Sequence, residues 1–160
     1  MRVFARYWLP PLAWMALILV MASDVGSAER SAGILVPLLT WLLPWATPDQ
    51  IRLLHALARK LGHFTEYAIL ATLWFRGLAG ERRLAPTTSA WVAVAVSLAW
   101  AILDEIYQGT VPSRTASPRD VMIDTVSATL AVLAARGWDG NRFRPSDADP
   151  GYPAARPRTG

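Results

Sequence analysis

Polar and ionisable side chains gather in short clusters at the ends of strongly hydrophobic segments of this 160-residue chain. A charged side chain close to the core of a bilayer costs roughly 3 kcal/mol or more, so such residues are rarely without a function. In chain order, the clustered residues are His63, Glu66, Tyr67, Asp104, Glu105, Gln108, Arg114 and Asp120.

These residue types indicate acid–base, metal or anion chemistry. A histidine can be a general base or a metal ligand, carboxylates can bind a divalent cation or transfer protons, and an arginine can hold a phosphate or a carboxylate. The candidate catalytic residues are His63, Glu66, Asp104 and Glu105. The candidate substrate-binding residues are Tyr67, Gln108, Arg114 and Asp120. The candidate metal ligands are His63, Glu66 and Glu105, a set that suits zinc, manganese or magnesium, although no fixed spacing motif identifies a metal.

Each cluster also has a purely structural interpretation. Asp120 follows Ser117 in a helix-start pattern, where a carboxylate stabilises the helix dipole. His63 and Glu66 could be a buried hydrogen-bonded pair that holds two helices together. The acidic pair of the second cluster could bind nearby arginines. Asp124 lies one turn after Asp120, and we expect it to be partnered or protonated.

The composition is typical of a membrane protein. Hydrophobic residues make up 53% of the chain and charged residues 18%, and the mean hydropathy is +0.26. Cysteine is absent, which excludes disulfides and thiolate metal sites. The net charge of +4 comes from arginines that lie mostly between hydrophobic runs. This placement favours contact with anionic lipids over binding of nucleic acid, for which no motif is present.

Four segments are predicted to cross the membrane, at about residues 7–22, 61–78, 88–107 and 120–135. The first is short, and Gly26-Ser27-Ala28 follows it like a cleavage site, so a cleaved signal peptide competes with the favoured retained helix. Residues 33–45 are too short to span and contain Pro37 and Pro44. They predict an interfacial or re-entrant segment between the first and second spans. The predicted fold is thus an all-α integral membrane bundle.

Other local signals complete the predicted organisation. Residues 47–50, Thr-Pro-Asp-Gln, are typical of a helix start, and an amphipathic turn follows before the second span. Residues 1–136 form the predicted transmembrane domain, and residues 137–160 form a mobile cytoplasmic tail. Small residues repeat every four positions on the third and fourth spans, which predicts close helix contacts. These stripes are Ala93, Ser97 and Ala101, continued by Glu105, and Ser127, Ala131 and Ala135.

The distribution of arginine and lysine predicts the orientation. More of these residues flank the side of the membrane that holds the two termini than the opposite side, so both termini are expected in the cytoplasm. The second span then starts outside, the third ends outside and the fourth starts outside. All the polar clusters therefore share the external face.

At these same residues the chain resembles the VanZ-like family of small polytopic membrane proteins. The matching words are residues 60–67 (Lys-Leu-Gly-His-Phe-Thr-Glu-Tyr), 104–108 (Asp-Glu-Ile-Tyr-Gln), 112–114 (Pro-Ser-Arg) and 120–124 (Asp-Val-Met-Ile-Asp). The similarity covers about residues 9–135, with departures at Asp124 and Ser127, where the family pattern has Asn and Gly. The resemblance implies a four-span bundle in the bacterial inner membrane, with the polar residues at its external face. The family name comes from low-level resistance to the glycopeptide teicoplanin.

Three functions remain open at this point. The protein could be an enzyme that modifies or hydrolyses a lipid-linked substrate, with a divalent metal ion as a possible cofactor. It could instead bind a lipid headgroup or an amphiphilic antibiotic without catalysis. A transporter subunit is less favoured, because the sequence shows no inverted repeat and its charges lie at one face. The expected partners are membrane lipids and a lipid-linked or amphiphilic ligand, and nucleic acid is not expected.

Overall fold

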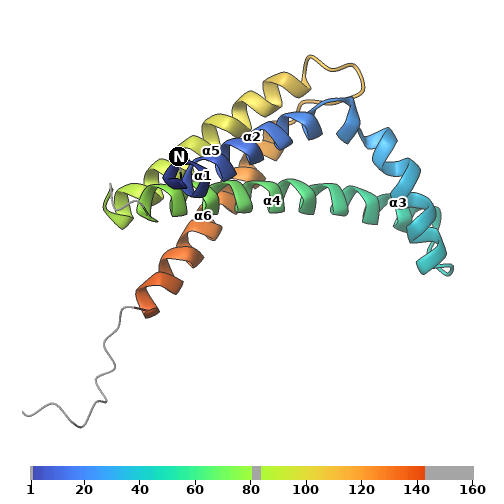
Figure 1. Ribbon diagram of the computed structural model, residues 1–160. Coiled ribbons are helices and arrows are strands. Elements are labelled where there is room, and N and C mark those ends of the chain that lie inside the picture. Colours follow the sequence, from blue (N-terminus) through green and yellow to red (C-terminus); the bar gives the residue numbers. More distant parts are fainter. Residues whose placement is uncertain (1, 81–83, 143–160) are drawn as a thin grey trace, which may run out of the picture.

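The computed structural model describes residues 2–80 and 84–142, and this part of the chain is helical and contains no β-strand. The helices pack as a bundle from which the α3 end projects (Figure 1). The predicted all-α membrane bundle is confirmed. In chain order the elements are α1 (Arg2–Tyr7), α2 (Leu9–Ala22), the short 3-10 helix η1 (Asp24–Gly26), α3 (Ala28–Leu42), α4 (Pro48–Gly80), α5 (Pro86–Gln108) and α6 (Pro118–Arg142).

Within the described residues, two helices are long and apolar enough to cross a membrane by themselves, at Pro86–Gln108 and Pro118–Trp138. These correspond to the predicted third and fourth spans. The segments Leu9–Ala22 and Asp24–Leu42 meet at an angle of 69° and together make a third candidate, either a broken span or a re-entrant loop. Helix α4 is not among these candidates, because polar and charged side chains interrupt its apolar sequence. The predicted span at residues 61–78 therefore stays a prediction, supported by the extensive packing of α4 against α5 and α6.

The N-terminal segments depart from the sequence expectation in one respect. Pro37 and Pro44 were expected to break the apolar run of residues 33–45. Helix α3 instead continues through Pro37 and ends at Leu42, before Pro44. Its first turn is capped by the Ser27 hydroxyl, which accepts a hydrogen bond from the amide of Arg30 at 3.2 Å. A proline inside a helix removes one backbone donor, and here the helix continues on both sides of it.

Helix α4 begins where the sequence predicted a helix start. The amide of Thr47 donates to Gln50 Oε1 at 2.8 Å, and the amide of Gln50 donates to Thr47 Oγ1 at 3.3 Å, so the capping box is confirmed. The predicted amphipathic turn and second span join into one continuous helix of 33 residues. Helix α6 also extends further than predicted and reaches Arg142. The rest of the predicted tail, residues 143–160, lies outside the described residues.

Small residues bring the three long helices close together. Ala93, Ser97 and Ala101 on α5 are all buried, as their spacing predicted. On α6 the predicted stripe is shifted: Ser127 is buried, whereas positions 131 and 135 are half-buried. The most buried line of α6 instead runs through Asp124, Ala128 and Val132. The apolar core lies mainly between α4, α5 and α6, and contains Tyr67, Leu70, Ala71, Phe75, Ala93, Ala101, Ala128 and Val132.

Candidate functional site

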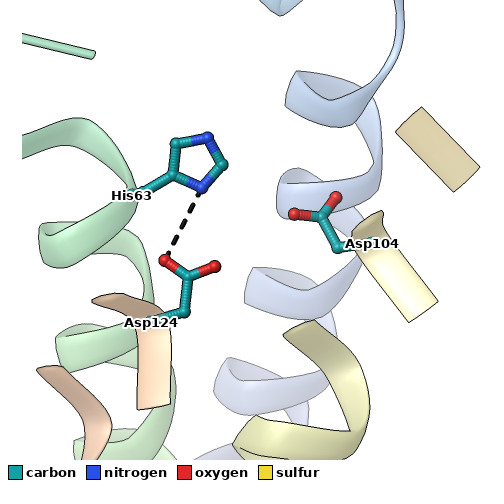
Figure 2. Close-up of side chains that lie close together, drawn as sticks. All are labelled: His63, Asp104 and Asp124. Carbon is teal, nitrogen blue, oxygen red and sulfur yellow. Dashed lines mark ion pairs between the residues drawn. The ribbon is translucent and has the colours of Figure 1, made fainter. Parts of the chain in front are cut away.

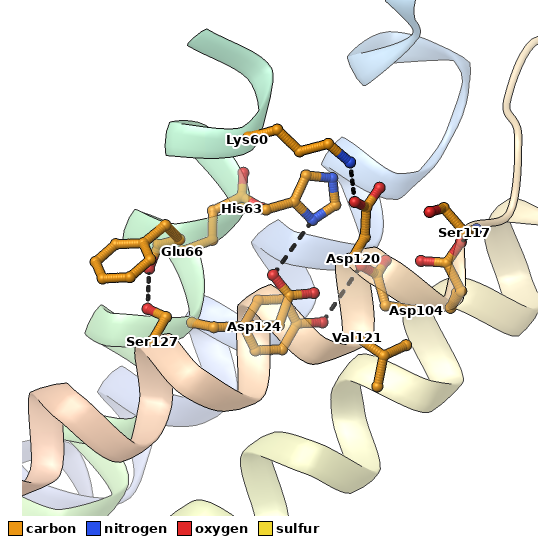
Figure 3. A network of polar contacts seen from close by, with 12 residues as sticks. Lys60, His63, Glu66, Asp104, Ser117, Asp120, Val121, Asp124 and Ser127 are labelled. Carbon is orange, nitrogen blue, oxygen red and sulfur yellow. Dashed lines mark hydrogen bonds and ion pairs between the residues drawn. The ribbon is translucent and has the colours of Figure 1, made fainter. Parts of the chain in front are cut away.

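The polar clusters, which are far apart in the sequence, meet where the middle of α4 faces the end of α5 and the start of α6 (Figure 3). Tyr67 on α4 donates its hydroxyl to Asp104 Oδ2 on α5 at 3.3 Å. Gln108, one turn further along α5, donates Nε2 to the same oxygen at 3.0 Å. The spacing of four residues places Asp104 and Gln108 on one face of the helix. The polar clusters of α4 and α5, which the sequence predicted on the same face of the membrane, are therefore in direct contact.

His63, Asp104 and Asp124 form the innermost group of the site (Figure 2). One ligand-type atom from each lies within 4.8 Å of the others. His63 Nδ1 and Asp124 Oδ1 are 3.6 Å apart, which makes an ion pair if the ring is protonated but is too long for a hydrogen bond. The three residues are 9%, 2% and 1% exposed. His63 Nδ1, Asp104 Oδ1 and Asp124 Oδ1 are all buried without a hydrogen-bond partner among the described residues.

The grouping differs from the metal set that the sequence suggested. Glu105 does not join His63, because its carboxylate accepts a hydrogen bond from the backbone amide of Ser117 and thereby fixes the start of α6. Consecutive helical residues point about 100° apart, so Asp104 and Glu105 cannot face the same partner. Asp124 joins His63 and Asp104 instead, whereas the sequence predicted only that Asp124 would be partnered or protonated. The sequence feature that could have identified Asp124 as a site residue is its spacing of four residues from Asp120, which places both on one face of a helix.

Asp120 lies at the edge of the site and is already paired. Its carboxylate accepts from the ammonium group of Lys60, which links the start of α6 to α4 (Figure 3). It also lies in the first turn of α6, as the structural interpretation expected. Its amide donates to the backbone carbonyl of Ser117 at 2.8 Å. Both observations favour a structural role for Asp120 over the predicted contact with substrate.

Two arginines close the site on the side of η1. Arg114 and Arg59 each donate Nη1 to the backbone carbonyl of Gly26, Arg59 at 3.0 Å. Burial lowers the pKa of the Arg114 guanidinium, and the neighbouring positive charge of Arg59 lowers it further. Arginine nevertheless stays charged at any physiological pH. Hydrogen bonds from two neighbouring guanidinium groups therefore hold the α5–α6 loop and α4 against the α2–α3 connection.

The solvent-exposed part of the α2–α3 connection carries the carboxylate of Asp24, which partly balances the positive charge of the arginines. The neighbouring Ser113 side chain lowers the pKa of the Asp24 carboxyl, and the positive charge of Arg30 lowers it further. Arg30 Nη2 lies 2.6 Å from Asp24 Oδ2. This pair is exposed to solvent, so it is expected to contribute little to stability.

A cavity of about 470 Å³ opens between η1, α2, α3 and α4 and reaches the end of α5 and the loop that follows it. Part of its lining is apolar and is formed by Ile18, Met21, Val25, Ile34 and Leu35. The rest of the lining includes the polar or charged residues Arg30, Arg59, His63, Glu66, Asp104 and Arg114. Six of the eight predicted site residues thus line the cavity or bond to a residue that does, whereas Glu105 and Asp120 are engaged elsewhere. Whether any of them is catalytic stays a prediction.

Comparison with known proteins agrees with the resemblance in the sequence. A model of the VanZ/LLP1 family matches residues 7–139, which is most of the chain. Searches of curated proteins and of solved structures found no match. The family match includes every helix that contributes to the cavity and to the group of His63, Asp104 and Asp124. The chain therefore belongs to the VanZ/LLP1 family of membrane proteins.

Proposed function

We propose that this protein binds a lipid-linked or amphiphilic envelope ligand with an anionic headgroup at the external face of the bacterial inner membrane. The observation that carries the proposal is the mixed lining of the cavity, in which apolar side chains and three arginines border the same space. An amphiphile with a phosphate or carboxylate head has the same division between apolar and charged parts.

The arginines that line the cavity suit an anionic group. Arg30, Arg59 and Arg114 all line it, and a guanidinium offers paired donors that match phosphate and carboxylate oxygens. Arg59 and Arg114 share a single carbonyl acceptor at Gly26. Each guanidinium has five N–H donors, so donors are left for a ligand.

The apolar residues that line the cavity suit a hydrocarbon chain. Ile34 of α3 is one of these residues and is 73% exposed. On the same projecting helix hairpin, Trp41 and Trp45 are 76% and 77% exposed. Tryptophan is enriched at the membrane–water interface. We infer that α3 lies in this interface and admits a lipid chain to the cavity from the side.

A catalytic role is the second candidate. His63 lines the cavity, and its Nδ1 faces the Asp124 carboxylate at 3.6 Å. A carboxylate beside one ring nitrogen can orient a histidine that acts as a general base at the other. In this version His63 would remove a proton from a nucleophile that attacks the bound headgroup.

Binding can be tested with the purified protein in detergent by native mass spectrometry against phosphatidic acid and the zwitterionic phosphatidylcholine. A charge-assisted hydrogen bond contributes about 1.5–3 kcal/mol, so Arg114→Gln should weaken binding of phosphatidic acid by about 10- to 100-fold. Arg136→Gln is the matched control, because Arg136 contacts Thr87 and does not line the cavity. Equal affinity for the two lipids in the wild type, or equal losses in the two variants, would contradict the proposal.

Catalysis and cellular role need a separate measurement. If His63 is a general base, His63→Gln should retain lipid binding but lose a teicoplanin-resistance phenotype in cells. A variant that keeps both would count against catalysis and leave the binding proposal intact. The proposed orientation, with both termini in the cytoplasm, predicts a cytoplasmic signal from a reporter fused after residue 140. An external signal would reverse the assignment of the faces.

A further inference from the structure

We propose that His63, Asp104 and Asp124 bind a divalent transition-metal ion at the inner end of the cavity. This site goes beyond the binding of an amphiphile and does not depend on it. It also differs from the metal set expected from the sequence, which contained Glu66 and Glu105 in place of the two aspartates.

The donor atoms are of the right kind and close enough together. One nitrogen and two carboxylate oxygens, from three different helices, lie within 4.8 Å of one another. An ion bound about 2.0–2.2 Å from each donor brings ligand atoms to separations somewhat shorter than this. Small side-chain adjustments are therefore enough to form the site.

The three donors share a second property that points to a bound cation. His63 Nδ1, Asp104 Oδ1 and Asp124 Oδ1 are buried and without hydrogen-bond partners among the described residues. Buried polar atoms are almost always satisfied, and buried carboxylates without a counter-charge are costly. Figure 2 shows the Asp124 carboxylate directed toward the imidazole, with Asp104 facing the same space from α5. One dipositive ion would satisfy all three atoms and neutralise both carboxylates.

Neighbouring side chains also orient the Asp104 carboxylate for binding a metal ion. Its other oxygen, Oδ2, accepts hydrogen bonds from Tyr67 and Gln108. Such outer contacts orient metal-ligating carboxylates in known metal sites. They leave Oδ1 directed away from both donors and available to an ion. Tyr67 and Gln108 are thus positioning residues.

The site would keep an open position toward the cavity. His63 and Asp104 both line the cavity, whereas Asp124 is not among its lining residues. Three protein ligands with one free position are typical of zinc ions that act on a substrate or on water. Mixed nitrogen and carboxylate donors suit Zn²⁺ or Mn²⁺ better than Mg²⁺, which prefers oxygen alone.

The metal content of the purified full-length protein tests the proposal. The protein in detergent is stripped with a chelator, exposed to Zn²⁺ or Mn²⁺, desalted and measured by mass spectrometry of the elements. The wild type should hold about one ion per chain, and Asp124→Asn and His63→Gln should each bind at least about tenfold more weakly. Glu105→Gln and His55→Gln are the matched controls and should bind as the wild type does. Tyr67→Phe should weaken binding by about tenfold, since it removes only an outer contact.

A spectroscopic measurement keeps the test decisive if a ligand variant fails to fold. The chain has two histidines, so His55→Gln labelled with ¹⁵N-histidine reports on His63 alone. Electron paramagnetic resonance of its Mn²⁺ complex should show coupling to one ¹⁵N nucleus. Absence of that coupling, a wild type that binds neither ion, or ligand variants that bind as tightly as Glu105→Gln would overturn the proposal. In each of these cases the lipid-binding measurement with Arg114→Gln still decides the proposed function separately.

Discussion

The hydrogen bonds to Asp104 allow a sharp test of how the buried polar site contributes to stability. Tyr67 is fully buried, and its ring packs in the same apolar cluster as Ile18, Leu70 and Ala101. Tyr67→Phe keeps this packing and removes only the hydroxyl that donates to Asp104 Oδ2. The change in the free energy of unfolding therefore reports mainly on that hydrogen bond.

The distances set the expected magnitude. A hydrogen bond to a charged group contributes about 1.5–3 kcal/mol. The Tyr67 hydroxyl is 3.3 Å from Asp104 Oδ2, beyond the usual range for O–H···O bonds, so we expect a loss of about 1 kcal/mol. Gln108 donates to the same oxygen at 3.0 Å, an ordinary N–H···O length. Gln108→Leu should accordingly cost about 2 kcal/mol.

The double variant should cost more than the sum of the single variants. Each single substitution leaves Asp104 Oδ2 with one of its two donors, whereas the double substitution removes both from a buried oxygen. An unsatisfied buried acceptor costs about 1–3 kcal/mol. We expect a coupling of about 1 kcal/mol and a total loss of about 4 kcal/mol.

Equilibrium unfolding in mixed detergent micelles, followed by tryptophan fluorescence, can measure these differences. The protein is treated with a chelator, so that a bound ion contributes nothing. Tyr107→Phe is the control, because Tyr107 lies on the same helix as Asp104 but is 42% exposed, and its change should stay within about 0.5 kcal/mol. The reasoning is refuted if Tyr67→Phe and Tyr107→Phe have equal effects, or if the two site substitutions are additive.

Four further predictions concern other parts of the fold. A Cβ at Gly77 would lie 2.8 Å from the backbone carbonyl of Tyr7, so Gly77→Ala should destabilise the protein by about 1–3 kcal/mol. Gly62→Ala on the same helix meets nothing within 4 Å and should stabilise it by about 0.5–1 kcal/mol in the same unfolding assay. Thr47→Ala removes half of the α4 capping box and should cost about 1 kcal/mol, and no change would show that this end of the helix is frayed. The pKa of Asp24 lies below its ordinary value because of the neighbouring Ser113 side chain and the positive charge of Arg30. Its contribution is therefore present above the ordinary pKa and lost as the pH falls through the lowered one, so stability curves of the wild type and Asp24→Asn should converge at acidic pH.

The local signals in the sequence were reliable where they depended on neighbouring residues. The capping box at residues 47–50, the alternation of loops with long apolar helices and the small-residue face of α5 all follow from helical spacing and backbone hydrogen bonding. Most of the polar residues selected from the sequence, because charge within an apolar sequence is costly, lie near one another in the structure, and their functional role stays a prediction. The family resemblance agreed with them and with the match over residues 7–139.

The structure differs from the sequence predictions where two adjacent residues were equally suited to the same place. Asp104 and Glu105 have the same chemistry and adjacent places, and the rotation of α5 alone decides that Asp104 faces His63 while Glu105 caps the start of α6. On α6, the buried line is shifted by one residue from the predicted stripe. Helical spacing gives the shape of a face but not its absolute direction, which depends on the helices packed around it.

The sequence by itself determined that this is a helical membrane protein and which residue types carry its chemistry, because hydropathy and helix capping are local properties. Only the tertiary structure decided that His63, Asp104 and Asp124 meet in one buried group, that Asp120 is held by Lys60, and that arginines and apolar side chains line the same cavity. Those outcomes depend on contacts between α4, α5 and α6 and on the bend between α2 and α3. Such contacts join residues far apart in the chain, and no local pattern specifies the rotation of one helix against another.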